Sequence, residues 1–416
     1  MHFLLVYIHM RHGGIETLIV RMANWLVKRG HKVTLFLKEP GDLLSDLDEK
    51  VEVEILGLKR FWFYLPFLGA KCLRKFGAKN VNVIYSYGPE GCFLASYIYK
   101  HAFKVNKPIF LNGIYHPHEF ALSGKPNILD RMYINLYNLH INDGTKIFMS
   151  DEVRSATERI LGQKVSRGAI WPLPIDGERF INKPKKIIPY RILSIGRYAN
   201  FKTYNLYMID VVEKLVEQGY DATWEVYGYG PLEAEMKKLV KERNLGDRIF
   251  IRGPLAYNKC VESLAQAHVW VGVGTALLEA GFCGVPCVPA IAYDTKGLTY
   301  GGLYDLPYYT CGEVLNDNFE TIPVVTAISR IFDMTEAEYQ AEANRTFQYV
   351  QPYSMNSLMQ KFLEYAENAP RMQNIESYSN WKYVLYCFKW LWFQARSTFA
   401  VRTRLRRLIR FEKINQ

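Results

Sequence analysis

Residues 268–291 read HVWVGVGTALLEAGFCGVPCVPAI, an almost wholly apolar stretch with one acidic residue, Glu279, near its middle. The flanking runs HVWVGVG and VPCVPAI are typical of strands buried on both faces, and TALLEAGFCG between them has helical character. This order of strand, helix and strand predicts a parallel α/β sheet. Because burying an unpaired carboxylate is costly, Glu279 needs a partner in that sheet.

The same alternation extends through the rest of the chain. Further strands are predicted at 3–9, 32–38, 81–87, 108–116, 146–150, 191–197, 222–230 and 248–253. Amphipathic segments separate them, such as IETLIVRMANWLVKRG (15–30), a helix closed by Gly30. We therefore predict two doubly wound, Rossmann-like domains whose ligand-binding strand ends face one cleft.

Breaks in this pattern give the domain boundaries. Prolines and the polar run KPKK interrupt the alternation at about residues 171–186. We therefore predict an N-terminal domain at 1–172 and a C-terminal domain at 173–351, followed by a segment at 352–370 and a basic tail at 371–416.

Composition and charge exclude several classes of protein. Of the 416 residues, 49% are hydrophobic and 22% are charged, which is typical of globular domains with sizeable cores. The net charge is +11, and residues 371–416 contribute +8 of it, from ten Lys or Arg against two Glu. The remainder is nearly neutral, so we expect no nucleic-acid partner. We also expect no signal peptide and no transmembrane helix, which needs roughly 18–20 apolar residues.

The basic tail combines cations with large apolar side chains. Lys382, Lys389 and Arg396 recur every seven residues and predict a basic stripe on a helix. The other sides of this helix carry Trp381, Leu385, Phe388, Leu391, Trp392 and Phe399. Such a helix suits the plane of an anionic bilayer. The alternative is a helix packed on the N-terminal domain with a solvated basic face.

Two cations and two glycines follow predicted strands of the second half. Arg197 lies at the end of the predicted strand at 191–197 and Lys202 five residues on, where a parallel sheet presents ligand-binding groups. A fork-shaped and a mobile cation suit a diphosphate, and two solvated loop cations are the alternative. Gly228 and Gly230, after the next strand, permit close approach of either a ligand or neighbouring backbone.

The turn before the central helix predicts an anion site. Thr275 is expected to cap this helix, leaving the N–H groups of Ala276 and Leu277 available to an anion. Glu279 follows one turn after Thr275 on the same face and can accept two hydrogen bonds from a vicinal diol such as a ribose. An arginine at the sheet edge is the alternative partner.

Six motifs in this order suggest a family: GGIE, PIDGERF, GRYANFK, YGYGP, RIFIRGPL and LLEAGFCGVPCV. Together they resemble the retaining nucleotide-sugar glycosyltransferases of family 4, or glycosyl transferases group 1, which have the GT-B fold of two facing Rossmann-like domains. The resemblance covers about residues 1–365. It implies that the segment at 352–370 is the helix that crosses back to the N-terminal domain.

The resemblance also implies roles for individual residues. Arg197 and Lys202 match the basic pair that holds the donor diphosphate and acts in catalysis, and Glu279 matches the glutamate that binds the ribose. The implied donor-binding backbone comprises Gly13, Gly14, Gly274, Thr275 and Ala276, and we count Gly228 and Gly230 as donor-binding as well.

Three more residues of the N-terminal domain are candidates. His116 is the best match for the histidine near the donor sugar, and we count it as catalytic, although His118 is close enough to be the alternative. His12, in the glycine turn, is a candidate substrate contact. Glu16 fits a helix-dipole residue and an acceptor contact equally well.

One position departs from the family pattern. The family usually has a second glutamate eight positions before Glu279, in a loop that contacts the donor sugar, and Val271 stands there. The strand then leads directly into the helix without that loop. Nucleotide binding is therefore better supported than the identity of the sugar or catalysis itself.

The expected mechanism requires little acid–base chemistry. In a retaining transfer the leaving diphosphate can take the proton of the incoming hydroxyl on the same face, while cations and helix amides stabilise its charge. We expect no metal or other cofactor, because two side-chain cations are available and no Asp-x-Asp follows a strand.

The resemblance and the basic tail together suggest a setting. We expect a cytoplasmic enzyme, peripheral on the inner face of the plasma membrane, that transfers sugar to a glycan or lipid-linked acceptor in bacterial surface polysaccharide synthesis. The alternatives are a nucleotide-sugar epimerase and a non-catalytic nucleotide-sugar-binding subunit.

Overall fold

The computed structural model describes residues 1–11, 13–57, 63–64, 70–121, 124–180, 186–255, 257–307, 309–312, 318–372 and 374–393. The chain forms two compact units. Unit 1 contains Met1–Phe148, Val153–Ala169 and the chain from Tyr365 on, and unit 2 contains Met149–Glu152 and Ile170–Glu364. Among the described helices, none is both long enough and apolar enough to cross a membrane.

Unit 1 is built on a seven-stranded sheet in the order β3-β2-β1-β4-β5-β6-β7. The strands are β1 (His2–Tyr7), β2 (Lys32–Leu37), β3 (Glu52–Ile55), β4 (Val83–Tyr87), β5 (Ile109–Ile114), β6 (Lys146–Phe148) and β7 (Ala169–Ile170). Neighbours from β3 to β6 pair in parallel, and Phe3 of β1 lies opposite both Val33 and Val83. The order reverses between β1 and β4, where doubly wound sheets bind ligands.

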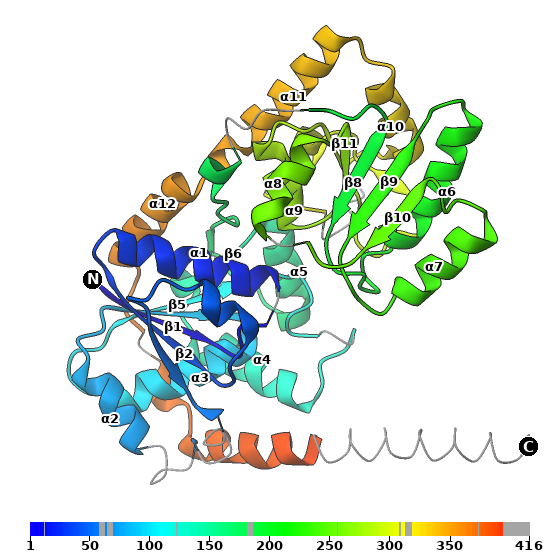
Figure 1. Ribbon diagram of the computed structural model, residues 1–416. Helices are drawn as coiled ribbons and strands as arrows, with labels where there is room; N and C mark the ends of the chain where they lie inside the picture. Colours follow the sequence, from blue (N-terminus) through cyan, green and yellow to red (C-terminus); the bar gives the residue numbers. More distant parts are fainter. Residues whose placement is uncertain are drawn as a thin grey trace, which may run out of the picture. The chain divides into compact units, whose positions relative to one another are not determined.

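Helices cover both faces of this sheet, with α1 on one face and α3 and α4 on the other (Figure 1). They are α1 (Gly14–Lys28), α2 (Ala70–Ala78), α3 (Gly88–Ala102), α4 (Ile128–His140) and α5 (Asp151–Leu161). On α1, Leu18, Met22 and Leu26 recur on one face and are buried. Gly30 ends this segment as predicted, with φ of +80° and its N–H donating to the carbonyl of Val27.

Unit 2 repeats the plan with a five-stranded parallel sheet in the order β10-β9-β8-β11-β12. The strands are β8 (Arg191–Ile195), β9 (Thr223–Tyr227), β10 (Ile249–Arg252), β11 (Val269–Gly272) and β12 (Cys287–Pro289). A separate antiparallel pair joins β13 (Leu298–Thr299) and β14 (Ile322–Pro323). The order reverses between β8 and β11, so this edge is the expected ligand site of unit 2.

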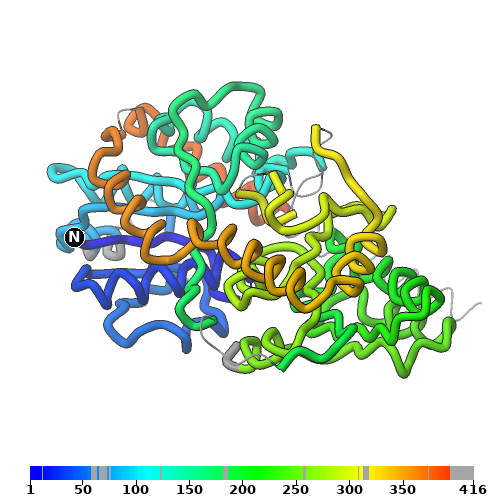
Figure 2. Tube along the Cα trace, turned by 90° about the horizontal axis from the view of Figure 1, so that it is seen from above, coloured from blue at the N-terminus to red at the C-terminus, as the bar shows by residue number. Residues whose placement is uncertain are grey.

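The helices of unit 2 follow its strands in sequence. They are α6 (Tyr204–Glu217), α7 (Glu233–Glu242), α8 (Tyr257–Ala265), α9 (Thr275–Phe282), α10 (Val324–Phe332), α11 (Glu336–Val350) and α12 (Met355–Asn368). Figure 2 allows the chain to be followed through α11 and α12, and within α12 it passes from unit 2 to unit 1. A further helix at residues 380–393 belongs to unit 1.

The stretch at 268–291 folds as predicted, into β11, α9 and β12. Trp270 of β11 lies opposite Cys287 of β12, and both are fully buried. Gly281 in α9 has a packing role, because a Cβ atom there would lie 2.6 Å from Val350 of α11. The two parallel α/β units confirm the predicted fold class. Of the tail, Arg396 and Phe399 lie outside the described residues.

Candidate functional site

Lys202 bridges the two strand ends at the switch point of unit 2. Its ammonium Nζ lies 3.5 Å from the carbonyl oxygen of Val273, which follows β11. A Cβ atom on Gly196, which follows β8, would lie 2.8 Å from the same Nζ. The absence of a side chain at Gly196 therefore makes room for the cation. Lys202 is half-buried, so its charge is only partly screened by water.

Arg197 lies on a loop whose backbone is fixed by its neighbour Tyr198. The Tyr198 ring is fully buried, and its hydroxyl donates to the carbonyls of Val226 at 2.9 Å and Arg252 at 2.7 Å. Arg197 itself is exposed, and no other described residue pairs with its guanidinium. The sequence interpretation missed Tyr198, which ties together the loops that follow β8, β9 and β10.

Gly228 and Gly230 are explained by contact with neighbouring backbone. A Cβ atom on Gly228 would lie 1.8 Å from the carbonyl oxygen of Gly196, and one on Gly230 would lie 2.5 Å from that of Tyr198. The N–H of Tyr198 also donates to the carbonyl of Tyr229 at 2.9 Å. Of the two predicted reasons for these glycines, close approach of backbone is the one seen, and donor contact there remains a prediction.

The helix α9 begins differently from the prediction. Gly274, with φ of +90°, is the N-cap residue, and Thr275 is the first helical residue without a side-chain capping hydrogen bond. The predicted Thr275 cap is therefore wrong, because the glycine makes the turn that the chain needs. The N–H of Leu277 is also not available to an anion, since it donates to the carbonyl of Gly274 at 3.0 Å.

Two amides at this helix end remain available to a ligand. Among the described residues, no acceptor is found for the N–H groups of Thr275 and Ala276, and both residues are half-buried. The carbonyl of Val273 that Lys202 contacts lies just before this helix end. The predicted cation and the predicted amides therefore come together at one edge of unit 2.

Glu279 is buried in the first turns of α9, with 7% of its surface exposed. Burial and then the negative charge of Glu279 raise the pKa of Cys260, in α8, to about 11. The carboxylate is therefore close to α8 as well as one turn from Thr275. Its binding to a ribose remains a prediction.

Val271 is a core residue of β11. Its side chain is fully buried, and its carbonyl accepts a hydrogen bond of 2.7 Å from the hydroxyl of Ser194. Only Val273 and Gly274 separate the end of β11 from the start of α9. The structure thus agrees with the prediction that the strand leads directly into the helix, and no acidic residue reaches the site from this position.

His116 lies two residues beyond β5, at the C-terminal edge of the sheet of unit 1. It is half-buried, and its Nδ1 accepts a hydrogen bond of 3.1 Å from the backbone N–H of His118. Burial and the nearby His118 lower the pKa of His116 to about 4, so its ring is neutral at pH 7. His118 is exposed. Which of the two contacts substrate remains a prediction.

Glu119 is a feature of this edge that the sequence interpretation missed. Its carboxyl group accepts hydrogen bonds from the backbone N–H of Tyr115, at 3.0 Å to Oε1, and from that of His116. Its Oε2 is shielded from water, has no hydrogen-bond partner among the described residues, and lies near Gly88, where a Cβ atom would be 3.1 Å away. Burial raises the pKa of Glu119 to about 8. The sequence feature that could have revealed Glu119 is its place in HPHE, as an acidic residue directly after a predicted strand.

The N-terminal glycine turn is organised around Glu16. Gly13 is the N-cap of α1 and Gly14 its first residue. Glu16 is buried, its carboxylate lies 3.3 Å from Nδ1 of His9, and a Cβ atom on Gly13 would lie 2.2 Å from one of its oxygens. Glu16 therefore lies against the start of its own helix, as a dipole partner does. His12 lies outside the described residues.

Metal ligands are not grouped in the described part of the chain. No set of three or more His, Cys, Asp or Glu side chains there is arranged to hold an ion. The expectation that no metal or cofactor takes part remains a prediction.

Comparison with known proteins gives two family matches. Residues 12–179 match the family described as Glycosyltransferase Family 4, and residues 178–299 match Glycosyl transferases group 1. Poly(ribitol-phosphate) alpha-N-acetylglucosaminyltransferase of Staphylococcus aureus is 24% identical over 44% of this chain and 36% of its own. The putative colanic acid biosynthesis glycosyltransferase WcaL of Escherichia coli is 26% identical over 30% of this chain and 34% of its own. This chain thus matches about a third of the length of either relative.

A solved structure extends the comparison to nearly the whole fold. The Anabaena protein Alr3699/HepE, in complex with UDP and glucose, superimposes with a TM-score of 0.62 at 14% identity. The match covers 88% of this chain and 99% of the Anabaena chain. At that identity it establishes the GT-B arrangement of two Rossmann-like domains and nothing about substrates.

Proposed function

This chain belongs to the family 4, or group 1, glycosyltransferases of the GT-B fold, and from that premise we propose that it transfers a sugar from a nucleoside diphosphate to a hydroxyl acceptor. The observation that carries the proposal is the edge of unit 2, where Lys202 lies next to the strand end that leads into α9. A cation beside free helix amides suits the two phosphates of such a donor.

The proposed mechanism follows from those groups. Lys202, Arg197 and the amides of Thr275 and Ala276 stabilise the charge that develops on the departing diphosphate. The diphosphate oxygen takes the proton of the incoming hydroxyl on the same face, so the sugar keeps its anomeric configuration. His116 contacts the sugar as a neutral ring, in keeping with its lowered pKa. No metal is needed in this account.

The names of relatives suggest a setting. Colanic acid biosynthesis is named for the Escherichia coli relative, and poly(ribitol-phosphate) for the Staphylococcus aureus one. We propose that this chain acts likewise in surface polysaccharide or glycolipid synthesis, on a glycan or lipid-linked acceptor. The basic tail at 371–416 would keep it peripheral on the inner face of the plasma membrane.

A donor panel tests the proposal. Purified protein is incubated with UDP-, GDP- and ADP-sugars, and the free nucleotide is measured with and without a membrane extract as acceptor source. Release with one donor, increased by the extract, supports the transferase. A bound nucleotide with an altered sugar supports an epimerase instead. Tight binding without turnover supports a non-catalytic subunit, which the buried Val271 in place of a second carboxylate would then explain.

A further inference from the structure

The helix at residues 380–393 has two apolar faces, and the described residues of the protein cover only one. Tyr383 and Tyr386 are buried, with 0% and 3% of their surfaces exposed. On the other face, Trp381 is 78%, Leu385 45%, Phe388 63% and Trp392 51% exposed. These four residues are spaced by four, three and four positions, so they form one stripe about 16 Å long. We call them the outer stripe.

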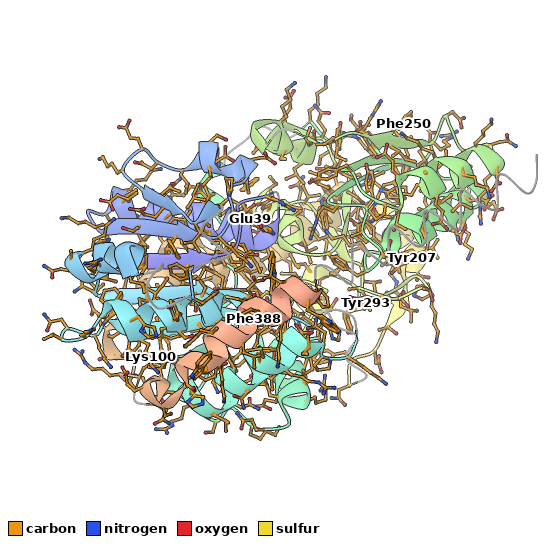
Figure 3. The ribbon with its side chains drawn as sticks, turned by 90° about the horizontal axis from the view of Figure 1, so that it is seen from below. Glu39, Lys100, Tyr207, Phe250, Tyr293 and Phe388 are labelled. Carbon is orange, nitrogen blue, oxygen red and sulfur yellow. The ribbon has the colours of Figure 1, made fainter. Side chains whose placement is uncertain are left out.

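The inner face fixes this helix to unit 1. The Tyr383 hydroxyl lies 2.9 Å from the hydroxyl of Ser96 in α3, and the Tyr386 hydroxyl lies 2.9 Å from that of Tyr133 in α4. The ring centroid of Phe93 lies 5.0 Å and 4.6 Å from those of the two tyrosines. The helix is therefore docked as a rigid element. Figure 3 shows it at the front of unit 1, with Phe388 labelled.

These contacts also give the direction of the helix. Tyr383 meets Ser96 and Tyr386 meets Glu90, at 3.2 Å, so the helix runs antiparallel to α3 and toward its first turn. Glu90 also pairs with Lys38, which directly follows β2, at 2.6 Å. The Lys38 ammonium lies 4.9 Å from the centroid of the Trp390 ring. The described part of the helix thus reaches the C-terminal edge of the sheet, the edge that carries His116 and Glu119.

The charge of the sequence that follows this helix indicates what binds to the outer stripe. The structure describes this helix as far as Phe393, and residues 394–416 carry seven Lys or Arg against one Glu. Aromatic side chains that lie next to a strong excess of cations suit the interface of an anionic bilayer. A protein partner or a second copy would have to match the same cations. Residues 39–54 of unit 1 carry seven Asp or Glu against one Lys, so a second copy is the alternative that the test below separates from a bilayer.

We propose that the outer stripe is the surface by which unit 1 rests on an anionic bilayer, and that the acceptor is a lipid-linked glycan which reaches the adjacent sheet edge from that bilayer. The inference about the acceptor rests on the proposed function, whereas the inference about the surface does not. Because the helix is docked and not tethered, the sheet edge keeps a fixed orientation to the membrane.

Vesicle binding tests the surface without any sugar. The full-length protein and a Trp381→Ser/Phe388→Ser variant are sedimented with vesicles of phosphatidylcholine alone or mixed with phosphatidylglycerol. We expect binding to the mixed vesicles only, and a partition coefficient that falls about tenfold or more in the variant, because two large apolar side chains are lost from the interface. Leu139→Ser is the matched control, since Leu139 is 59% exposed on α4 of the same unit.

Several outcomes would contradict the proposal that the outer stripe rests on an anionic bilayer. They are a double variant that binds as well as the wild type, a Leu139→Ser variant that loses as much, and wild-type protein that ignores the anionic lipid. A wild-type dimer that the double variant abolishes without any change in vesicle binding would assign the stripe to a second copy. Circular dichroism of the variants confirms folding, since the replaced side chains are mostly exposed.

The acceptor class has a separate readout. With whichever labelled donor is turned over, a membrane lipid extract should place the label in the organic phase, and the double variant should lower that yield about tenfold while nucleotide hydrolysis without acceptor is unchanged. Label found only in water-soluble product overturns the lipid-linked acceptor. Vesicle binding without turnover of any donor contradicts the proposed function and leaves the surface established.

Discussion

The edges of the two sheets have the same topology but opposite chemistry. The edge of unit 2 presents Lys202 and the amides of Thr275 and Ala276, all suited to negative charge. The edge of unit 1 instead holds two buried carboxyl groups, those of Glu16 and Glu119. A doubly wound sheet fixes where a ligand binds, and the loops that follow its strands decide which ligand. We therefore propose that unit 2 binds the donor and unit 1 the acceptor.

The largest effect is expected from removing the cation of unit 2. Lys202→Ala should lower the turnover of the preferred donor by a factor of about 10²–10³, or about 2.7–4 kcal/mol of barrier, because one charge-stabilising donor is lost. Lys238→Ala, on an exposed lysine of α7, is the control and should change nothing. Steady-state nucleotide release measures both. Equal activity of the two variants would remove Lys202 from the site.

The next effect concerns the glycines that bring the loops of unit 2 together. Gly228→Ala places a Cβ atom against the carbonyl of Gly196, so we expect a loss of about 1–3 kcal/mol in the free energy of unfolding. Gly246→Ala is the control, because a Cβ atom there meets nothing within 4 Å. Urea unfolding of both variants measures the change in the free energy of unfolding. If the Gly228→Ala protein were as stable as the wild type but no longer bound nucleotide, these glycines would be assigned to ligand contact.

The smallest effect belongs to the carboxyl group of unit 1. Because the pKa of Glu119 is raised to about 8, the folded state holds a proton there that the unfolded state releases above about pH 4.5. The free energy of unfolding should therefore fall by about 1–2 kcal/mol as the pH rises from 6.5 to 8. Glu119→Gln should flatten this dependence. An equally steep slope in the variant would show that Glu119 is ionised in the fold.

Much of this fold was predictable because hydrophobic periodicity and glycine positions are local signals. The strands around 191–195 and 269–272 and the helix end at Gly30 were placed within a few residues. The sequence analysis missed β3 because EVEI is short and half of it is charged. Edge strands often have this composition, which lacks the apolar pattern of a buried strand. In the tail, aromatic residues on both faces concealed which face docks until Tyr383 and Tyr386 were seen to be buried.

The candidate site was less predictable because it depends on backbone angles and long-range contacts. Whether Gly274 or Thr275 caps α9 depends on the φ of +90° at Gly274, which no pattern of apolar residues specifies. Tyr198 acts through Val226 and Arg252 on other strands, and Glu119 is shielded beside Gly88, which is distant in sequence. The cations near β8 were recognisable from sequence because they directly follow a strand, and a strand end is a local feature.

The measurement that tests the account most directly is calorimetric titration of the protein with UDP, GDP and ADP. We expect one nucleoside diphosphate to bind at a single site. Glu279→Ala and Lys202→Ala should each weaken that binding by about tenfold or more, with unfolding midpoints like the wild type, since each removes a charge-assisted hydrogen bond worth about 1.5–3 kcal/mol. Absence of nucleotide binding, or full affinity in both variants, would contradict a donor site at the edge of unit 2.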